Sequence, residues 1–267
     1  MPKLKWDEIG KRLYETGTKQ GVLFPQASDG TYPEGVAWNG LTNVSANPSG
    51  ADANPFYADD QKYIELRGAE NFGGSIGAFT HPDEWYECDG CKVIAPGVVV
   101  HQQTRRPFGF TWRTIIGNDT EKEDFGYKIH LAWNATASPS GRDYQTTNES
   151  PDAVNMSWEF TTTPVKVAAA GVKPMSYLEV RSDKTPKANL EALEAALYGT
   201  DDTYAETEDA SMDSSKTYYT LVNGEYTAFE GESFVEGTTY YEKTGEGTAS
   251  HLPTPDEVFK ILGYTGA

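Results

Sequence analysis

Apolar and aromatic residues occupy every second position in three segments in the middle of the chain. The alternating residues are Phe108, Phe110 and Trp112; then Tyr127, Ile129, Leu131 and Trp133; then Val154, Met156, Trp158 and Phe160. Successive side chains of a strand point to opposite faces, so this spacing predicts three strands that each place one face on a core. Further strands are predicted at Lys62–Gly68, Ser75–Thr80 and Ser176–Val180, between turn-forming Gly, Pro and Asn residues. The pattern predicts a mainly β chain that folds as an antiparallel β-sandwich.

Two short helices are predicted beside the strands. Leucines spaced i, i+3 and i+7 lie among Ala and Glu after Pro186, and Gly199 follows the last of them. The spacing predicts one amphipathic helix that flanks the sandwich and ends at Gly199. A shorter helix is predicted after Thr254, which can cap Pro255 and the apolar residues up to Leu262. Residues 17–60 are rich in Gly, Pro, Asn and Ser, and we interpret them as a long arm or loop that contains strands.

Negative charge is concentrated in one part of the chain. The chain of 267 residues has 40 acidic and 22 basic residues, and residues 201–250 alone hold twelve acidic and two basic ones. In this block Thr217-Tyr218-Tyr219 is repeated as Thr239-Tyr240-Tyr241, with an Asn-Gly turn signal at Asn223 between them. We therefore predict that residues 205–250 form a separate acidic β-meander module on the surface. Residues 1–204 and 251–267 would form the sandwich domain.

The acidic balance argues against tight binding to nucleic acid, since sequence-independent affinity for phosphates comes from Lys and Arg. The N-terminal residues contain no apolar signal region, and no segment approaches the roughly 20 apolar residues of a membrane span. We expect neither a cleaved secretion signal nor a membrane segment.

Two short motifs have catalytic counterparts elsewhere. Cys88 and Cys91 form C-x-x-C, but thiol exchange needs a thiolate at a helix N-terminus in a βαβ setting, which the flanking prolines do not suggest. A zinc site would need two further ligands; the histidines are His81, His101, His130 and His251. We favour two partly buried loop cysteines over redox or zinc chemistry. Gly73–Gly77 matches G-x-S-x-G, but a nucleophile elbow needs a helix directly after the serine, so a glycine-rich strand or bulge is the better interpretation.

The remaining polar candidates are interpreted as non-catalytic. His130 alternates with Ile129 and Leu131, which predicts a surface or interface position rather than a general base. The Arg105-Arg106 pair beside Pro107 is typical of an interface or an ion pair. Phosphate-binding loops, H-E-x-x-H and dinucleotide fingerprints are absent from the sequence. We predict that the protein is not an enzyme and that it uses no catalytic residue, cofactor or metal.

Several segments, read in order, resemble the major tail proteins of long-tailed, siphovirus-type bacteriophages, which build the tail tube. The resemblance covers about residues 1–204 and 251–267 and depends on the ordered set, since each motif is short. The segments are Trp38–Thr42, Tyr57–Asp60, Phe79–Glu84, Cys88–Gly90, Gly126–Leu131, Trp158–Glu159, Thr162–Val165, Leu197–Thr200 and Leu252–Val258. In the family, the segment like Leu197–Thr200 tends to run almost directly into the one like Leu252–Val258. Here the acidic block separates the two, which is consistent with a module inserted into a surface loop.

The resemblance implies a structural virion protein. It implies a two-sheet sandwich with a flanking helix, assembly of six copies into a ring, and stacking of rings into a tube through which phage DNA is ejected. The implied partners are further copies of the chain, the tape-measure protein, and the tail terminator and distal tail proteins. Double-stranded DNA would pass without specific binding, and no membrane would be involved. The implied location is the virion tail, after assembly in the host cytoplasm.

The resemblance also implies a role for the negative charge of the protein. A basic channel would hold DNA through many phosphate contacts, so an acidic or neutral wall is expected to let it slide. We predict a net negative channel wall, with Glu65 as a lumen-facing contributor.

Two alternatives come from other functional classes. A carbohydrate- or surface-binding β-sandwich would expose Trp and Tyr as a sugar platform, whereas the tryptophans here fall on core-like stripes. A hydrolase on a jelly-roll scaffold would need two carboxylates about 5 to 10 Å apart in one cleft, and the sequence singles out no such pair.

Overall fold

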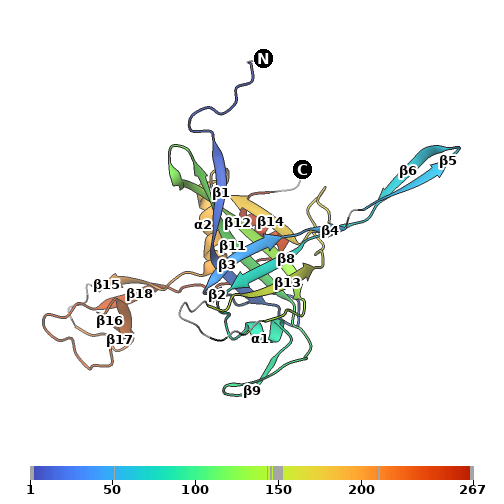
Figure 1. Cartoon of the computed structure of the whole chain (residues 1–267). Coiled ribbons are helices and arrows are strands. Elements are labelled where there is room, and N and C mark those ends of the chain that lie inside the picture. Colours follow the sequence, from blue (N-terminus) through green and yellow to red (C-terminus); the bar gives the residue numbers. More distant parts are fainter. Residues whose placement is uncertain are drawn as a thin grey trace.

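The computed structural model describes residues 3–264, except 51, 143, 145, 147–152, 208 and 210. Within these residues the chain forms eighteen strands and three helices, and every strand pairing is antiparallel. The prediction of a mainly β, antiparallel fold is confirmed. Figure 1 shows a central β body from which two slender elements extend in different directions.

The body is one eight-stranded sheet that bends until its two parts face each other. Its order is β2-β1-β11-β12-β13-β8-β3, with β14 also paired to β12. The strands are β1 (Leu13–Pro25), β2 (Val36–Trp38), β3 (Leu41–Ala46), β8 (Gly73–Ala78), β11 (Phe108–Asn118), β12 (Lys122–Ala137), β13 (Met156–Thr162) and β14 (Tyr177–Arg181). β12 is long enough to pair with β14 through residues 128–132 and with β13 through residues 135–137. The sandwich is therefore continuous through β12, where two separate sheets were expected.

An aromatic core fills the space inside the bend. Phe108 of β11 lies 6.2 Å from Phe160 of β13 between ring centroids, and Trp38 of β2 lies 5.7 Å from Trp158. The short helix α1 (Trp85–Cys88) adds Trp85, which packs 5.5 Å from Trp158. All these rings are at most 4% exposed, so this core holds the two parts of the sheet together.

A second core lies on the outer face of β12, under helices α2 (Lys187–Tyr198) and α3 (Pro255–Ile261). Leu190, Leu193 and Leu197 of α2 pack there, as the helical spacing predicted. Gly199 ends α2 with a φ of 74°, and an added Cβ would lie 2.6 Å from a backbone oxygen, so only glycine fits. At α3, Thr254 and Glu257 form a capping box, which confirms the second predicted helix start.

The predicted stripes are on strands, but they do not share one core. Trp112 of β11 pairs with His130 of β12, so these two side chains lie on the inner face. Ile129, Leu131 and Trp133 consequently point to the outer core. Both faces of the sheet are covered at β11 and β12, so Thr111, His130 and Ala132 between the stripes are buried as well, whereas Ser157 and Glu159 of β13 are exposed. Val154 lies outside β13 and is exposed, which shortens the third predicted strand.

The prediction of an arm over residues 17–60 is wrong in its limits. β1, β2 and β3 hold residues 17–46 in or near the main sheet, because β1 pairs with both β11 and β2. The element that extends from the body is the hairpin of β5 (Ala53–Ala58) and β6 (Gln61–Arg67), at the end of the pair β4 (Ser49–Gly50) and β7 (Glu70–Asn71). A second small hairpin, β9 (Lys92–Ala95) and β10 (Val98–Val100), follows α1.

The acidic block forms its own four-stranded sheet. Its strands are β15 (Thr203–Glu206), β16 (Tyr218–Val222), β17 (Glu225–Ala228) and β18 (Tyr241–Gly245). Asn223 and Gly224, both with positive φ, make the predicted turn between β16 and β17. The order β15-β18-β16-β17 is not the predicted meander, because the first and last strands lie side by side. That pairing brings the two ends of the insertion together, as a loop insertion requires, and the sheet begins two residues before the predicted boundary.

Candidate functional site

The strands β1, β11, β12 and β14 form a four-stranded part of the sheet with an unpaired edge on each side. In the described part of the chain, residues 13–20 of β1 pair only with β11, since β2 pairs only with residues 21–23. On the other side, β14 pairs only with β12. Unpaired edges offer N–H and C=O groups to another strand.

The backbone direction at the β14 edge follows from its hydrogen bonds to β12. Ser182 N–H donates to the Tyr127 carbonyl, and Ser176 accepts from Trp133 N–H, both at 2.9 Å. Alternate residues of an antiparallel strand point the same way, so the backbone groups of Tyr177 and Glu179 face the open side.

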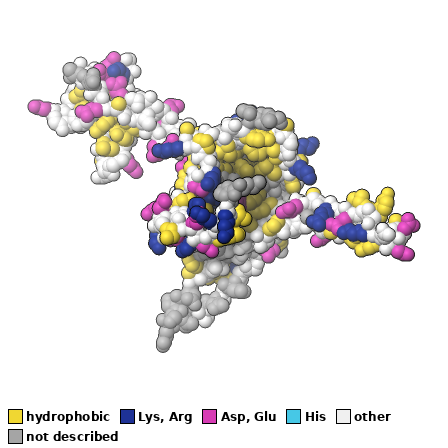
Figure 2. All heavy atoms as spheres, turned by 90° about the horizontal axis from the view of Figure 1, so that it is seen from above, with side chains coloured by type: hydrophobic (Ala, Val, Ile, Leu, Met, Phe, Trp, Pro, Cys, Tyr) yellow, Lys and Arg dark blue, Asp and Glu magenta, His cyan; other side chains and the backbone are white. Residues whose placement is uncertain are grey.

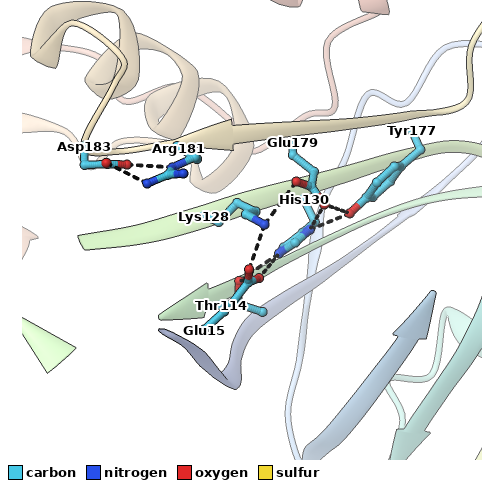
Figure 3. A network of polar contacts seen from close by, with 8 residues as sticks. All are labelled: Glu15, Thr114, Lys128, His130, Tyr177, Glu179, Arg181 and Asp183. Carbon is cyan, nitrogen blue, oxygen red and sulfur yellow. Dashed lines mark hydrogen bonds and ion pairs between the residues drawn. The ribbon is translucent and has the colours of Figure 1, made fainter. Parts of the chain in front are cut away.

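A chain of polar side chains crosses this four-stranded part on its inner face, beside Trp112 (Figure 3). His130 lies at its centre and is 5% exposed. Its Nε2 lies 2.9 Å from the Thr114 hydroxyl, and its Nδ1 lies 2.7 Å from the Tyr177 hydroxyl. His130 was predicted at a surface or interface position; the surface position is wrong, because the imidazole ring stacks on Trp112 with ring centroids 4.7 Å apart.

A carboxylate lies at each end of this row of polar side chains, and one lysine contacts both carboxylates. Thr114 donates to Glu15 at 2.6 Å, and Tyr177 donates to Glu179 at 2.7 Å. Lys128 Nζ lies 2.8 Å from Glu15 and 3.1 Å from Glu179. The contacts therefore connect β1 to β14 across β11 and β12.

The surroundings shift the pKa of each ionisable group in the chain. The pKa values of Glu15 and Glu179 are both lowered. Burial alone would raise them, but hydrogen bonds from Lys128, Thr114 and Tyr177 outweigh burial. Burial lowers the pKa of His130, and the nearby carboxylates oppose this only in part. Burial and the bond to Glu179 raise the pKa of the Tyr177 hydroxyl, which keeps its proton. At neutral pH both carboxyls are ionised and His130 is neutral.

These directions predict that acid destabilises the fold. A carboxyl with a lowered folded pKa contributes stability that is lost as pH falls below its ordinary value of 4.5, and a histidine with a lowered pKa loses its contribution below 6.5. We expect the unfolding free energy measured by chemical denaturation to decrease as pH falls below about 6.5, because burial opposes protonation of His130, and to decrease further below about pH 4.5, where the two carboxyls take up protons. The double variant Glu15→Gln with Glu179→Gln should show a shallower decrease below about pH 4.5. An equal slope there would mean that the two carboxylates contribute nothing to the pH dependence.

The polar side chains around His130 do not have the arrangement of a catalytic nucleophile and its base. The Thr114 hydroxyl already donates toward Glu15, and the second nitrogen of His130 faces a phenol rather than a carboxylate. The nearby pocket, about 190 Å³, is lined by Leu13, Tyr14, Glu15, Ile116, Lys128 and Arg181, without His130. Arg181 is itself bound by Asp183 at 2.8 Å. The geometry is that of a link between strands.

The two motifs weighed in the sequence lie apart from this chain. Cys88 and Cys91 are unpaired, and burial raises the pKa of Cys88 to about 12. Cys91 is buried with its Sγ 3.1 Å from His101 Nδ1. In the described ranges, no three His, Cys, Asp or Glu side chains are placed to share a metal ion. Gly73–Gly77 lies within β8, so the strand interpretation of G-x-S-x-G is confirmed.

Apolar side chains are exposed on both projecting hairpins. The β5–β6 hairpin exposes Phe56, Tyr57, Tyr63, Ile64 and Leu66, and the β9–β10 hairpin exposes Val93, Ile94 and Val98. A two-stranded hairpin is marginal by itself, and neither of these has a core of its own. Figure 2 shows apolar groups among charged ones on the β5–β6 hairpin at the right, and both acidic and apolar groups on the module at the upper left. Glu65, the predicted lumen residue, lies on β6 and binds Lys62 and Arg67.

Sequence reasoning missed Glu15, Thr114, Lys128 and Glu179. They are common surface residue types on strands whose pairing the sequence does not specify. The alternation around Lys128 and His130 gave the only available signal, since a polar residue within an otherwise apolar strand needs a partner if it is buried.

No protein-family model and no curated protein matches the sequence. None of the helices among residues that the structure describes is long and apolar enough to cross a membrane. The functional conclusion therefore depends on the structure of the protein itself.

Proposed function

We propose that this protein is a structural subunit that assembles with copies of itself into rings and tubes, and that it is the major tail tube protein of a long-tailed bacteriophage. The observation that carries the proposal is the pair of unpaired edges on opposite sides of the four-stranded part. A chain with one such edge could form a dimer, whereas two opposite edges allow each copy to bind two neighbours.

The strand directions suit this pairing. Each of β1, β11, β12 and β14 is antiparallel to the next, so β1 and β14 run in opposite directions. If β1 of one copy lies beside β14 of the next copy, related by rotation about an axis along the strands, the new pair is antiparallel. Rotation that closes gives a ring whose barrel has four strands per copy. Each contact should bury more than about 1,000 Å² in total to be stable.

The exposed hairpins supply the additional contact area. The β5–β6 hairpin extends well beyond the body, so it can reach a copy in the same ring or in a stacked ring (Figure 1). Its exposed aromatic and aliphatic side chains are the residue types that anchor protein interfaces. The acidic module points away from this hairpin and would lie outside the tube.

The proposal assigns the channel wall to the part of this inner face that lies beyond the aromatic core, where Glu15 and Glu179 are partly exposed, since α2 and α3 cover the outer face. That wall carries Glu15, Lys128 and Glu179, so it is nearly balanced in charge and offers DNA few free cations. Glu65 lies on the hairpin instead, which moves the proposed lumen contribution from Glu65 to the carboxylates of the sheet. In this role the protein needs no catalytic residue, and the tape-measure, terminator and distal tail proteins would be its partners in the virion.

Electron microscopy of the purified protein over a wide concentration range tests this proposal. Rings or hollow rods, together with sedimentation coefficients that rise with concentration, are the expected result. A strictly monomeric protein at all concentrations and salt conditions would overturn it. A tryptophan sugar platform is not supported, since Trp38, Trp85, Trp112, Trp133 and Trp158 are buried.

A further inference from the structure

The polar chain on the four-stranded part lacks one proton when His130 is neutral. Four links join its five members: Glu15 to Thr114, Thr114 to His130, His130 to Tyr177, and Tyr177 to Glu179. Each link is a hydrogen bond and needs one proton between its two atoms. The two hydroxyls supply one proton each, and neutral imidazole supplies one, so only three links can form at once. An imidazolium supplies the fourth.

The distances decide which link is missing in the neutral form. Tyr177 is the more acidic hydroxyl and donates strongly to Glu179, whose other donor, Lys128, is 3.1 Å away. Thr114 donates to Glu15 at 2.6 Å, the shortest of the four links, whereas its hydroxyl lies 2.9 Å from Nε2, the longest of the four. Nδ1–H therefore donates to the oxygen of Tyr177 at 2.7 Å, and the link between Nε2 and Thr114 is not made.

We propose that His130 is a proton-operated link between the two edge strands. With neutral His130, the bond between Thr114 and Nε2 is not made. When a proton binds Nε2, the Thr114 hydroxyl accepts from Nε2–H while it still donates to Glu15, so all four links are made. This change needs no movement of the backbone.

Charges around His130 favour this second state, whereas burial opposes it. Glu15 of β1 lies 3.6 Å from Nε2, and Glu179 of β14 lies 3.7 Å from Nδ1. Lys128 of β12 is the cation between the same carboxylates. Two carboxylates then face two cations, so the protonated chain is neutral overall. Trp112 of β11 covers one face of the imidazole ring, and Phe72 stacks on Tyr177 at 4.1 Å, so these neighbours add no charge.

The link joins the two strands that carry the unpaired edges. Glu15 is on β1, and the Glu179 backbone faces the open side of β14. A proton at His130 therefore tightens the contact between the edges across the sheet. That consequence for assembly rests on the proposed function, but the proton uptake at His130 does not.

The test is a nitrogen-15 NMR titration of the histidine rings in the full chain, kept below any assembly concentration. We expect Nδ1 to carry the proton of neutral His130, and both nitrogens to be protonated in acid. Thr114→Val, which removes the acceptor for Nε2–H, should lower the proton affinity of His130 about tenfold. Thr114→Ser should restore it.

Thr111→Val is the matched control, because Thr111 lies on the same strand, is fully buried, and its hydroxyl has no hydrogen-bond partner among the residues that the structure describes. It should leave the His130 titration unchanged. The inference is overturned if neutral His130 carries its proton on Nε2, if His130 stays neutral to pH 4, or if Thr114→Val leaves its proton affinity unchanged. Since the protein is monomeric in this experiment, failure to form rings would not affect the outcome.

Discussion

Excision of the β5–β6 hairpin is expected to leave the sandwich folded and to abolish self-assembly. Ala53 and Arg67 are paired across the base of the hairpin, so a short Gly-Ser turn between them can replace residues 54–66 without strain. No residue of the hairpin belongs to either core. The excision removes five exposed apolar side chains. If even two act as interface anchors, at about 2 kcal/mol each, association weakens by roughly 1,000-fold.

The acidic module provides the matched control for this excision. Thr203 pairs with Gly245, so the module can be replaced by a similar turn between neighbouring ends. We expect this second variant to form the same rings and rods as the intact chain, as seen by electron microscopy and sedimentation. Both variants should unfold at nearly the same temperature as the intact protein. Assembly that survives loss of the hairpin and disappears with the module would contradict the proposed roles of both elements.

Replacement of Trp158 by alanine should cause the largest loss of monomer stability. Trp158 is 1% exposed and packs against Trp38, Trp85 and His81 in the core between the two parts of the sheet. Its indole N–H also donates to Asp89 at 3.2 Å. Large-to-small changes of this kind cost about 3–5 kcal/mol, because the cavity cannot close around the lost ring. Denaturant titration followed by circular dichroism measures the change.

Trp6→Ala is the control, since Trp6 is 75% exposed and makes no contact in either core. We expect its unfolding free energy to lie within about 0.5 kcal/mol of the intact protein. Trp158→Phe should lose less than Trp158→Ala, because the smaller ring still fills part of the site. Equal losses for Trp158→Ala and Trp6→Ala would show that the bent sheet does not depend on this core.

Local patterns predicted the elements better than their arrangement. The leucines of α2, the cap at Thr254 and the turn at Asn223 each depend on neighbours within a few residues, and all three are confirmed. The limits of the projecting segment were wrong, because Gly and Pro content does not distinguish a strand inside the sheet from a hairpin outside it. His130 was misplaced for a related reason. Alternation identifies two faces of a strand, but both faces of β12 are buried at residues 129–133.

The sequence by itself determined the class of fold, the positions of most strands and both longer helices, and the acidic insertion, since these follow from periodicity, caps and charge along the chain. Only the tertiary structure decided that β12 joins the two parts of the sheet, that β1 and β14 are its open edges, and that Glu15 and Glu179 meet at His130. Those contacts join residues far apart in sequence, up to 164 positions between Glu15 and Glu179. Strand pairing of that range depends on which surfaces fit together in three dimensions, and no local pattern records it.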